Sequence, residues 1–261
     1  MIKQVYEDYK EKVLDILKDE PSRSLFITGD ILTYGMHNDF QDVYVDEDEN
    51  GIHGIYLRYR NSLVFYVNDK VVDEEGVCAL IDHPKTELVS SVRSHIEKLP
   101  IFIQDKIRQR DTYLCECRNL KGKITKAVRA SVEDAEGIID GLLSIEEFTG
   151  DSRPRNKKIE DLKRELSENN KANFIIKEDG KVIANASSTA RSNVGLMVVA
   201  VYTLKEYRQK GHARDVVSAL TKWALEEKLV PCLFYDNPSA GKLYHDLGYV
   251  TIDTWVMGKK I

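Results

Sequence analysis

The segment 194–213, VGLMVVAVYTLKEYRQKGHA, holds the residues whose types and spacing most clearly predict binding chemistry. An apolar, β-branched run leads into a polar turn, and a helical pattern begins directly after Gly211. The first N–H groups of a helix have no partners within it, and glycine lets a ligand approach the backbone closely. A strand, a turn and a helix in this order can therefore bind a phosphate group. A solvated turn without a ligand is the alternative, and the spacing alone favours neither.

Basic residues surround this predicted start of a helix. Arg208, Lys210 and Arg214 add positive charge at the end of the helix dipole that already favours anions. The small side chain of Ala213 leaves room in the first turn. The segment contains neither the G-x-x-x-x-G-K-[ST] pattern of P-loops nor the G-x-G-x-x-G pattern of dinucleotide sites. Both of these common phosphate sites are thus excluded.

The helix that must position the turn has one apolar face. Its apolar residues recur at helical spacing, which predicts that they pack against a sheet. They are Ala213, Val216, Val217, Leu220, Trp223 and Ala224. With this face buried, the N-terminus of the helix projects from the edge of the sheet.

A second informative segment is 236–249, DNPSAGKLYHDLGY. Asn237 is a favourable N-cap, Pro238 suits the first helical position, and Gly248 is typical of a helix end. Tyr244 lies on the apolar face of this short helix. It is either a core tyrosine or a phenol directed into a cleft, and residue statistics favour the core.

Together the two segments resemble the GNAT family of acetyl-CoA-dependent N-acetyltransferases. The family signature, an apolar strand followed by [QR]-x-x-G-x-[GA] at a helix start, fits Arg208-Gln209-Lys210-Gly211-His212-Ala213. A downstream Asn, a small residue and a Tyr before a Gly-aromatic pair also fit. These are Asn237, Ala240, Tyr244 and Gly248-Tyr249. The resemblance covers about residues 122–261.

The resemblance implies a site for acetyl-CoA as co-substrate, with no metal. The turn would bind the pyrophosphate, and the backbone of 199–203 would bind the pantetheine arm and the thioester carbonyl, with the Val201 N–H as an oxyanion donor. Asn237 would hold the pantetheine region, and Tyr244 would protonate the departing thiolate. The implied cofactor-binding residues are Val199, Val201, Tyr202, Thr203, Arg208, Gln209, Lys210, Gly211, His212, Ala213, Arg214 and Asn237.

No general base is apparent. The strand at 194–201 carries no carboxylate, and Glu206 and Asp236 are weak candidates. A water relay, or an amine that arrives partly deprotonated, is at least as good an interpretation. We expect His212 to face CoA phosphate or solvent and His245 to lie on a helix surface.

The pattern of elements predicts two domains, at 1–118 and 122–261, with the boundary near the polar stretch 119–123. The fold class predicted is α/β (α+β), with a GNAT-like, mostly antiparallel sheet flanked by helices and preceded by a smaller α+β domain. The helix and strand content of that first domain is compatible with a degenerate second GNAT-like copy, which the spacing of its residues does not show. Its predicted elements are a helix at 6–17, strands at 42–45, 52–59 and 63–67, and a helix at 86–99.

The second predicted domain alternates strands and helices. Ser131 caps a helix that reaches about residue 148, and Asp134 lies in its first turn. The remaining expected elements are a strand at 124–130, a basic loop at 150–158, a helix at 159–166, a hairpin at 173–177 and 182–189, and strands at 232–235 and 250–257.

Composition limits the classes of function. The net charge is −5, so nucleic acid is not an expected partner, and no apolar run approaches the roughly 18 residues of a membrane span. The N-terminus carries acids where a signal peptide needs an apolar core. The 4 cysteines are too sparse for a disulfide framework and lack the spacing of a metal site. We expect a cytoplasmic protein, and the oligomeric state stays open.

These features lead to a working hypothesis: an N-acetyltransferase in which a primary amine attacks acetyl-CoA directly within a ternary complex. The absence of an evident base keeps a non-catalytic CoA-binding or scaffold module as an alternative. Transfer of another acyl group on the same fold is a further one. The acceptor, an amine-bearing small molecule or protein, is not specified by these residues.

Overall fold

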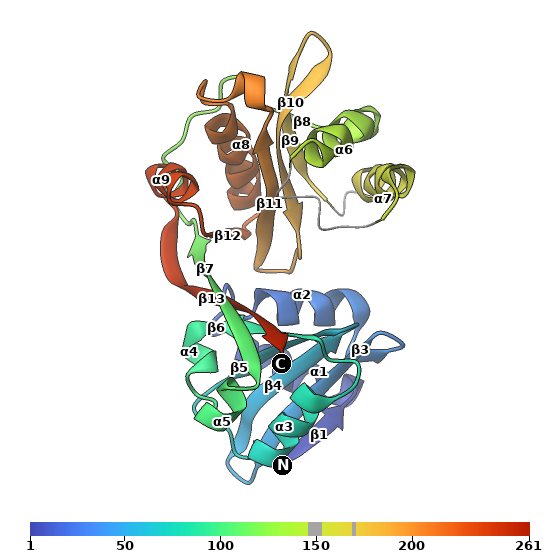
Figure 1. Cartoon of the computed structure of the whole chain (residues 1–261), viewed down its shortest axis with the longest axis vertical. Coiled ribbons are helices and arrows are strands. Elements are labelled where there is room, and N and C mark those ends of the chain that lie inside the picture. Colours follow the sequence, from blue (N-terminus) through green and yellow to red (C-terminus); the bar gives the residue numbers. More distant parts are fainter. Residues whose placement is uncertain (146–152, 169–170) are drawn as a thin grey trace. The chain divides into compact units, whose positions relative to one another are not determined.

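The computed structural model describes residues 1–145, 153–168 and 171–261 (Figure 1). They form two compact units. The first contains Met1–Cys115, Phe234–Asp236 and Thr251–Ile261, and the second contains Glu116–Leu233 and Asn237–Val250. Most of the last strand in chain order therefore belongs to the first unit. The sequence-based division into 1–118 and 122–261 stays a prediction.

The first unit is a sheet covered by helices on both faces. Its strands follow the order β1-β3-β4-β5-β6-β13-β7, with β2 beside β3, and β5 and β6 run parallel. The strands are β1 (Ile2–Val5), β2 (His37–Asn38), β3 (Gln41–Asp48), β4 (Gly51–Tyr59), β5 (Ser62–Val67), β6 (Leu88–Val92), β7 (Ile107–Glu116) and β13 (Val250–Lys260). The helices are α1 (Lys10–Leu17), α2 (Leu25–Tyr34), α3 (Glu74–Asp82), α4 (Arg93–Ile96) and α5 (Ile101–Gln104).

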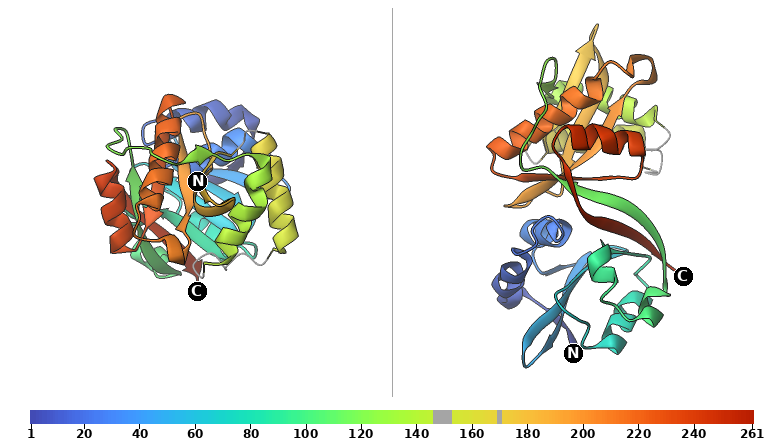
Figure 2. Two further views of the ribbon diagram at one scale, coloured as in Figure 1. Left: turned by 90° about the horizontal axis from the view of Figure 1, so that it is seen from above. Right: turned by 90° about the vertical axis from the view of Figure 1, so that its left-hand side faces the viewer.

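Two hydrophobic clusters hold these helices on the sheet. Val13 and Ile31, from α1 and α2, pack with sheet residues such as Val43. Val77 of α3 and Ile103 of α5 belong to the second cluster. The right-hand view of Figure 2 shows α1 and α2 on one face of this sheet and α3 and α5 on the other.

The predicted helix at 86–99 is wrong. Residues Leu88–Val92 form β6, and only Arg93–Ile96 is helical. The β6 backbone pairs with β5 on one side and with β13 on the other. These partners are distant in the sequence, so their hydrogen bonds override a local pattern that suits either structure.

The second unit has a mixed α/β fold, with a mostly antiparallel sheet flanked by helices. Its strands follow the order β12-β11-β10-β9-β8, and only β11 and β12 run parallel. They are β8 (Val128–Arg129), β9 (Asn173–Glu178), β10 (Lys181–Thr189), β11 (Gly195–Thr203) and β12 (Val230–Tyr235). The helices are α6 (Ala135–Leu143), α7 (Arg155–Ser167), α8 (His212–Glu226) and α9 (Pro238–Asp246).

The predicted hairpin, the predicted α8 and the predicted cap at Ser131 are confirmed, and the structure shows that Ser131 forms a capping box with Asp134. Two expectations were wrong in extent. The strand at 124–130 shrinks to Val128–Arg129, and residues 155–158 of the expected basic loop begin α7. The expected helix end near 148 lies outside the described residues. Figure 1 shows α8 on one side of the sheet and α6 and α7 on the other.

A glycine allows α6 to approach β11 closely. Tyr202 of β11 donates a hydrogen bond from its hydroxyl to the Ile138 carbonyl oxygen at 3.1 Å. A Cβ atom on Gly141 would lie 2.2 Å from the same hydroxyl oxygen. Burial raises the pKa of Tyr202, so the phenol stays neutral and keeps its proton for this bond.

We expect Gly141→Ala to lower the free energy of unfolding by about 1–2 kcal/mol, because the methyl group displaces the Tyr202 ring. Urea unfolding followed by circular dichroism measures the change. Glycine-to-alanine changes inside helices ordinarily stabilise by about 1 kcal/mol. A gain of that kind in the variant would contradict the close packing described.

Candidate functional site

The turn between β11 and α8 combines two left-handed residues. Gln209 has a φ of 63° and Gly211, the N-cap of α8, has a φ of 81°. Between β11 and this turn, Lys205–Tyr207 form a 3-10 turn. Left-handed residues in a tight turn direct successive N–H groups toward one side and form a concavity that suits an anion.

The backbone N–H groups of this turn have no acceptors in the part of the protein that the structure describes. Asp215 N–H donates to the Gly211 carbonyl oxygen at 3.1 Å and is the first donor of the α8 ladder. Within the described residues, no N–H group from Gln209 to Arg214 donates a hydrogen bond to the protein. These consecutive donors lie at the positive end of a 15-residue helix. They can bind an anion such as a pyrophosphate.

Two basic side chains of the turn interact with other groups of the protein. Arg208 Nε donates to the Thr203 carbonyl oxygen at 3.1 Å, and Arg214 pairs with Asp246 at 3.0 Å. Lys210 lies 5.5 Å from the centroid of the Tyr207 ring. The side chain of Lys210 therefore adds positive charge beside the free N–H groups.

His212 does not face solvent. It is 6% exposed, and its buried Nε2 atom has no hydrogen-bond partner among the described residues. Of the two surroundings expected for it, solvent is wrong and contact with a bound phosphate stays a prediction. His245 lies exposed on α9, as expected.

A bulge interrupts β11 before the turn. Val199 pairs with Ser187 and Tyr202 pairs with Asn185, so Ala200 and Val201 together face the single residue Ala186. Ala200 has a φ of 52°, which is strained for a residue other than glycine. In such a bulge, backbone N–H and C=O groups leave the hydrogen-bond ladder between the strands and point in other directions.

A buried polar network fixes the bulge. Asn185 Nδ2 donates to the Ala200 carbonyl oxygen at 2.9 Å and to Ser187 Oγ at 3.0 Å. Asn173 Nδ2 donates to Asn185 Oδ1 at 3.0 Å. All three side chains are at most 2% exposed. Hydrogen bonds of this kind offset the cost of the left-handed residue.

The strands β11 and β12 pair over a short distance. Three residue pairs join them, from Gly195 with Val230 to Met197 with Cys232. In the described part of the chain, no pairing with β12 is found beyond Met197, although β11 continues to Thr203. The backbone of 198–203 is thus open on that edge for a ligand.

The second sequence segment forms α9 as predicted. Asn237 Oδ1 accepts a hydrogen bond from the Ser239 N–H at 2.9 Å, which confirms the N-cap. Tyr244 is 7% exposed, and its ring lies edge-on to Tyr249 with centroids 5.9 Å apart. The catalytic role of Tyr244 and the pantetheine contact of Asn237 stay predictions.

Neither weak candidate for a general base is a desolvated carboxylate. Glu206 is exposed and pairs with Lys181 at 3.1 Å. Its own backbone N–H and Lys181 lower the pKa of Glu206. Asp236 is also exposed and pairs with Arg110. A base poised near neutral pH needs the opposite environment, one that raises its pKa.

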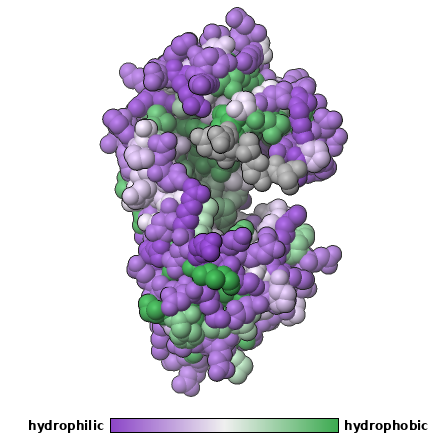
Figure 3. Space-filling view, viewed as in Figure 1, coloured by the Kyte–Doolittle hydropathy of each residue, from purple (hydrophilic) through white to green (hydrophobic). Residues whose placement is uncertain are grey.

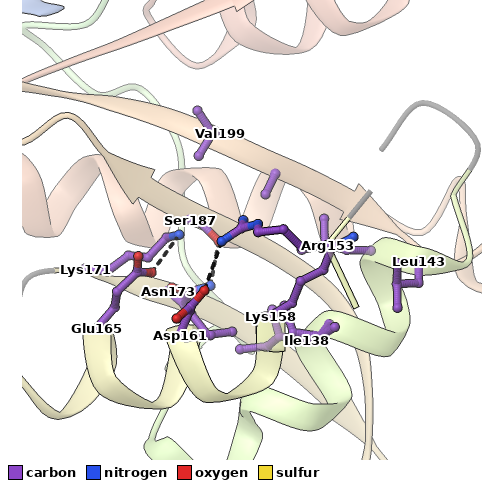
Figure 4. Close-up of a pocket in the computed structure, with 14 residues that line it drawn as sticks. Ile138, Leu143, Arg153, Lys158, Asp161, Glu165, Lys171, Asn173, Ser187 and Val199 are labelled. Atoms are coloured by element: carbon purple, nitrogen blue, oxygen red, sulfur yellow. Dashed lines mark hydrogen bonds and ion pairs between the residues drawn. The ribbon is translucent and has the colours of Figure 1, made fainter. Parts of the chain in front are cut away.

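The sequence missed a pocket of about 340 Å³ between α6, α7 and the sheet (Figure 4). Ile138, Leu142, Leu162 and Val199 give it apolar walls. Arg153, Lys158, Asp161, Glu165 and Lys171 give it charged ones. Ala200 of the bulge also lines it. Lys158, Asp161 and Glu165 have helical spacing on α7 and look like a solvated face, so the sequence carries no signal for the pocket.

Comparisons with known proteins agree with this geometry. Residues 166–257 match the family model described as GNAT acetyltransferase, so this part of the chain is similar to that family. A comparison with curated proteins gave no match.

Solved structures resemble the whole chain, and two of the three that follow are named as GNAT proteins. A Drosophila protein is 14% identical, with 100% of this chain and 98% of that chain covered and a TM-score of 0.70. A GNAT acetyltransferase from Colwellia psychrerythraea is 12% identical over 100% of both chains, with a TM-score of 0.63. A tandem GNAT protein from the clavulanic acid biosynthesis pathway is 10% identical, with 99% and 97% covered and a TM-score of 0.60. At these identities the likeness concerns the fold.

Polar and charged residues cover most of the visible face of each unit (Figure 3). Of the helices that the structure describes, none combines the length and the apolar character needed to cross a membrane. Across residues 1–145, 153–168 and 171–261, no cluster of three or more metal-ligating side chains is found.

Substitution of the bulge residue tests its strain. We expect Ala200→Gly to leave the free energy of unfolding unchanged or to raise it, because relief of about 1–2 kcal/mol of left-handed strain offsets the added chain entropy. The matched control is Ala186→Gly, opposite in the sheet, which should lose about 1 kcal/mol or more. Equal losses in the two variants, measured by urea unfolding, would refute a strained bulge.

Proposed function

We propose that the protein is an N-acetyltransferase that transfers the acetyl group of acetyl-CoA to a primary amine by direct attack within a ternary complex. One observation carries the proposal. The consecutive free N–H groups from Gln209 to Arg214 lie at the end of a bulged strand within the part of the chain that is similar to GNAT acetyltransferases.

The residues of the turn fit acetyl-CoA. Its pyrophosphate would accept hydrogen bonds from the N–H groups of Gln209, Gly211 and their neighbours. The left-handed φ of Gly211 holds the concavity open, and no atom lies within 4 Å of where its Cβ would be. Lys210 supplies further positive charge, and Asn237 would contact the pantetheine arm.

The bulged strand would position the reacting carbonyl. The open edge of β11, from Val199 to Thr203, would hydrogen-bond the pantetheine amides, and the Val201 N–H would donate to the thioester oxygen as negative charge develops there. Acetyl-CoA supplies an acetyl group already activated as a thioester. The chain therefore has to align the amine and stabilise charge.

Tyr244 would act as the general acid. The amine nitrogen forms its bond to the acetyl carbon, the carbon–sulfur bond breaks, and the sulfur takes a proton from the Tyr244 hydroxyl. The amine releases its own proton to water, and the Tyr244 phenolate takes a proton back from water. This route needs no carboxylate on the central strands. It is therefore compatible with the exposed, ion-paired positions of Glu206 and Asp236.

The first unit fits a degenerate second copy of the same fold. The chain from β1 to β7 and the chain from β8 to β13 each run in the order strand, two helices, three strands, helix, strand, helix and strand, apart from the short additions β2 and α4 in the first of them. The strands β5 and β6 run parallel over three residue pairs, as do β11 and β12. The turn before α3 thus corresponds to the turn before α8.

The corresponding turn of the first unit is filled by the protein's own carboxylates. Asp46 is fully buried, and its Oδ2 accepts from the N–H groups of Val72 and Asp73 at 2.6 and 3.0 Å. Asp73 accepts from the N–H groups of Ile2 and Gly76 at 2.7 and 2.9 Å. A pyrophosphate would meet negative charge there instead of free donors. We infer one acetyl-CoA site per chain, in the second unit, of a protein that works in the cytoplasm.

The general acid is tested by Tyr244→Phe. We expect kcat to fall by about 10²-fold or more while the affinity for CoA, measured by calorimetry, stays unchanged, because the lost hydroxyl acts on sulfur only as the thioester breaks. Thiol release from acetyl-CoA with a panel of amines gives kcat.

The matched control is Tyr207→Phe, which removes a hydroxyl beside the turn on the 3-10 segment. It should keep both kcat and CoA affinity. Unchanged kcat in Tyr244→Phe would remove Tyr244 from the mechanism. CoA binding without thiol release from any amine would favour the non-catalytic module.

A further inference from the structure

Another pocket of the second unit lies at the end of β11, beside the turn that precedes α8. Its walls come from α6, from the tip of the β9–β10 hairpin and from residues 204–208. Its volume of about 630 Å³ suits a group of the size of a nucleoside. Arg208 lines this pocket and directly precedes Gln209, the first residue of the turn whose N–H group has no acceptor among the described residues. The pocket therefore borders the proposed pyrophosphate site.

The two carboxylates that line this pocket already have cationic partners. Asp140 Oδ1 and Oδ2 accept hydrogen bonds from Arg155 at 2.6 and 2.8 Å, and Arg155 lies outside the lining. Glu206 pairs with Lys181, which is part of the lining, at 3.1 Å. The negative charges of the lining are therefore compensated by neighbouring cations.

Two cations of the lining have no carboxylate partner. Within residues 1–145, 153–168 and 171–261, no Asp or Glu side chain pairs with Lys205 or Arg208. Arg208 Nε donates to the Thr203 carbonyl oxygen at 3.1 Å, and its Nη groups have no acceptor among the same residues. An anionic group in the pocket can therefore accept charge-assisted hydrogen bonds from both side chains.

The remaining walls of the pocket suit a flat, largely apolar group. Val182 and Leu204 are buried and supply apolar surface. Gly137, Gly141 and Gly180 add surface without side chains. Mostly apolar walls with a few charged groups are typical of sites that bind small organic ligands. A purine ring beside an anionic group matches this combination.

We propose that this pocket holds the 3′-phosphoadenosine of CoA, with the 3′-phosphate bound by Lys205 and Arg208. The inference rests on the proposed pyrophosphate site at the turn. In CoA one ribose carries the pyrophosphate, the adenine and the 3′-phosphate, so the last two must lie close to the turn. It follows that the acyl donor is a thioester of CoA and not a phosphopantetheine arm on a carrier protein, which has no adenosine.

A second basic neighbour of the helix start provides a matched control. The Lys126 N–H donates to Asp215 Oδ2 at 2.7 Å, and Asp215 lies in the first turn of α8. The Thr125 N–H and hydroxyl also donate to Asp215, at 2.8 and 2.7 Å, so this backbone is held beside the helix. Lys126 is exposed and is not part of the pocket lining. A 3′-phosphate outside the pocket could depend on Lys126, whereas one inside it depends on Lys205.

Calorimetry with CoA and with dephospho-CoA, which lacks only the 3′-phosphate, tests the assignment. We expect the unaltered protein to bind CoA about tenfold or more tightly than dephospho-CoA. Lys205→Met should lower this preference to about threefold or less and leave the affinity for dephospho-CoA unchanged. Lys126→Met should keep the preference. Circular dichroism checks that each variant is folded, and Lys205→Gln is the second variant, in case the first is not.

Donor turnover tests the consequence for the acyl donor. The kcat/KM for the donor is measured with acetyl-CoA and with acetylated acyl carrier protein, each with the same panel of amines. We expect acetyl-CoA to be the better donor by about tenfold or more, because only CoA carries the group that Lys205 and Arg208 bind. A carrier protein that is an equal or better donor would overturn the donor assignment.

The pocket assignment and the proposed reaction fail in different ways. Equal affinity for CoA and dephospho-CoA, a preference that survives in the folded Lys205 variant, or one that Lys126→Met also removes would overturn the pocket assignment and leave acetyl transfer standing. The expected pattern of affinities without thiol release from acetyl-CoA with any amine would support the pocket and overturn the proposed reaction. The absence of binding for both ligands would overturn both.

Discussion

The N-terminus of α8, where backbone N–H groups have no acceptors among the described residues, is the constraint on which the rest of the second unit depends. The apolar face of α8, with Val216 and Leu220 fully buried, fixes the helix on the sheet. The left-handed Gly211 then ends the turn so that the N–H groups from Gln209 to Arg214 stay unpaired. Unpaired donors cost free energy when they are buried, and at this turn an anion can satisfy them. Helix packing thus creates the binding chemistry.

The bulge in β11 and the pocket beside it depend on the same sheet. Asn185 holds the Ala200 carbonyl oxygen, which stabilises a left-handed alanine in the strand. The row of paired residues from Asn173 to Val199 then forms the floor on which α6 and α7 enclose a pocket. In the first unit, Asp46 satisfies the N–H groups at the corresponding turn. The two units therefore have similar folds that differ at this turn. Only in the first unit does a carboxylate of the chain supply the negative charge.

The sequence predicted α8, the cap of α9 and the hairpin β9–β10, because each depends on residues close together in the chain. The sequence did not predict the features that depend on residues far apart in the chain. Leu88–Val92 is a strand because β5 and β13 pair with it. The bulge at Ala200 depends on Asn185 in the neighbouring strand, and the pocket depends on α7, whose charged residues look like a solvated face. The helix start at 208–213 was evident because glycine and basic residues occur there at a recognisable spacing.

The most direct test of the central claim is a titration of the 15N-labelled protein with CoA, followed by the amide NMR signals. The account predicts that the signals of Gln209 to Arg214 shift saturably with CoA and shift much less with pantetheine, which lacks the pyrophosphate. The signals of Val72 and Asp73 should stay unchanged, because Asp46 already accepts from both N–H groups. Unmoved signals from Gln209 to Arg214 at saturating CoA would contradict the account.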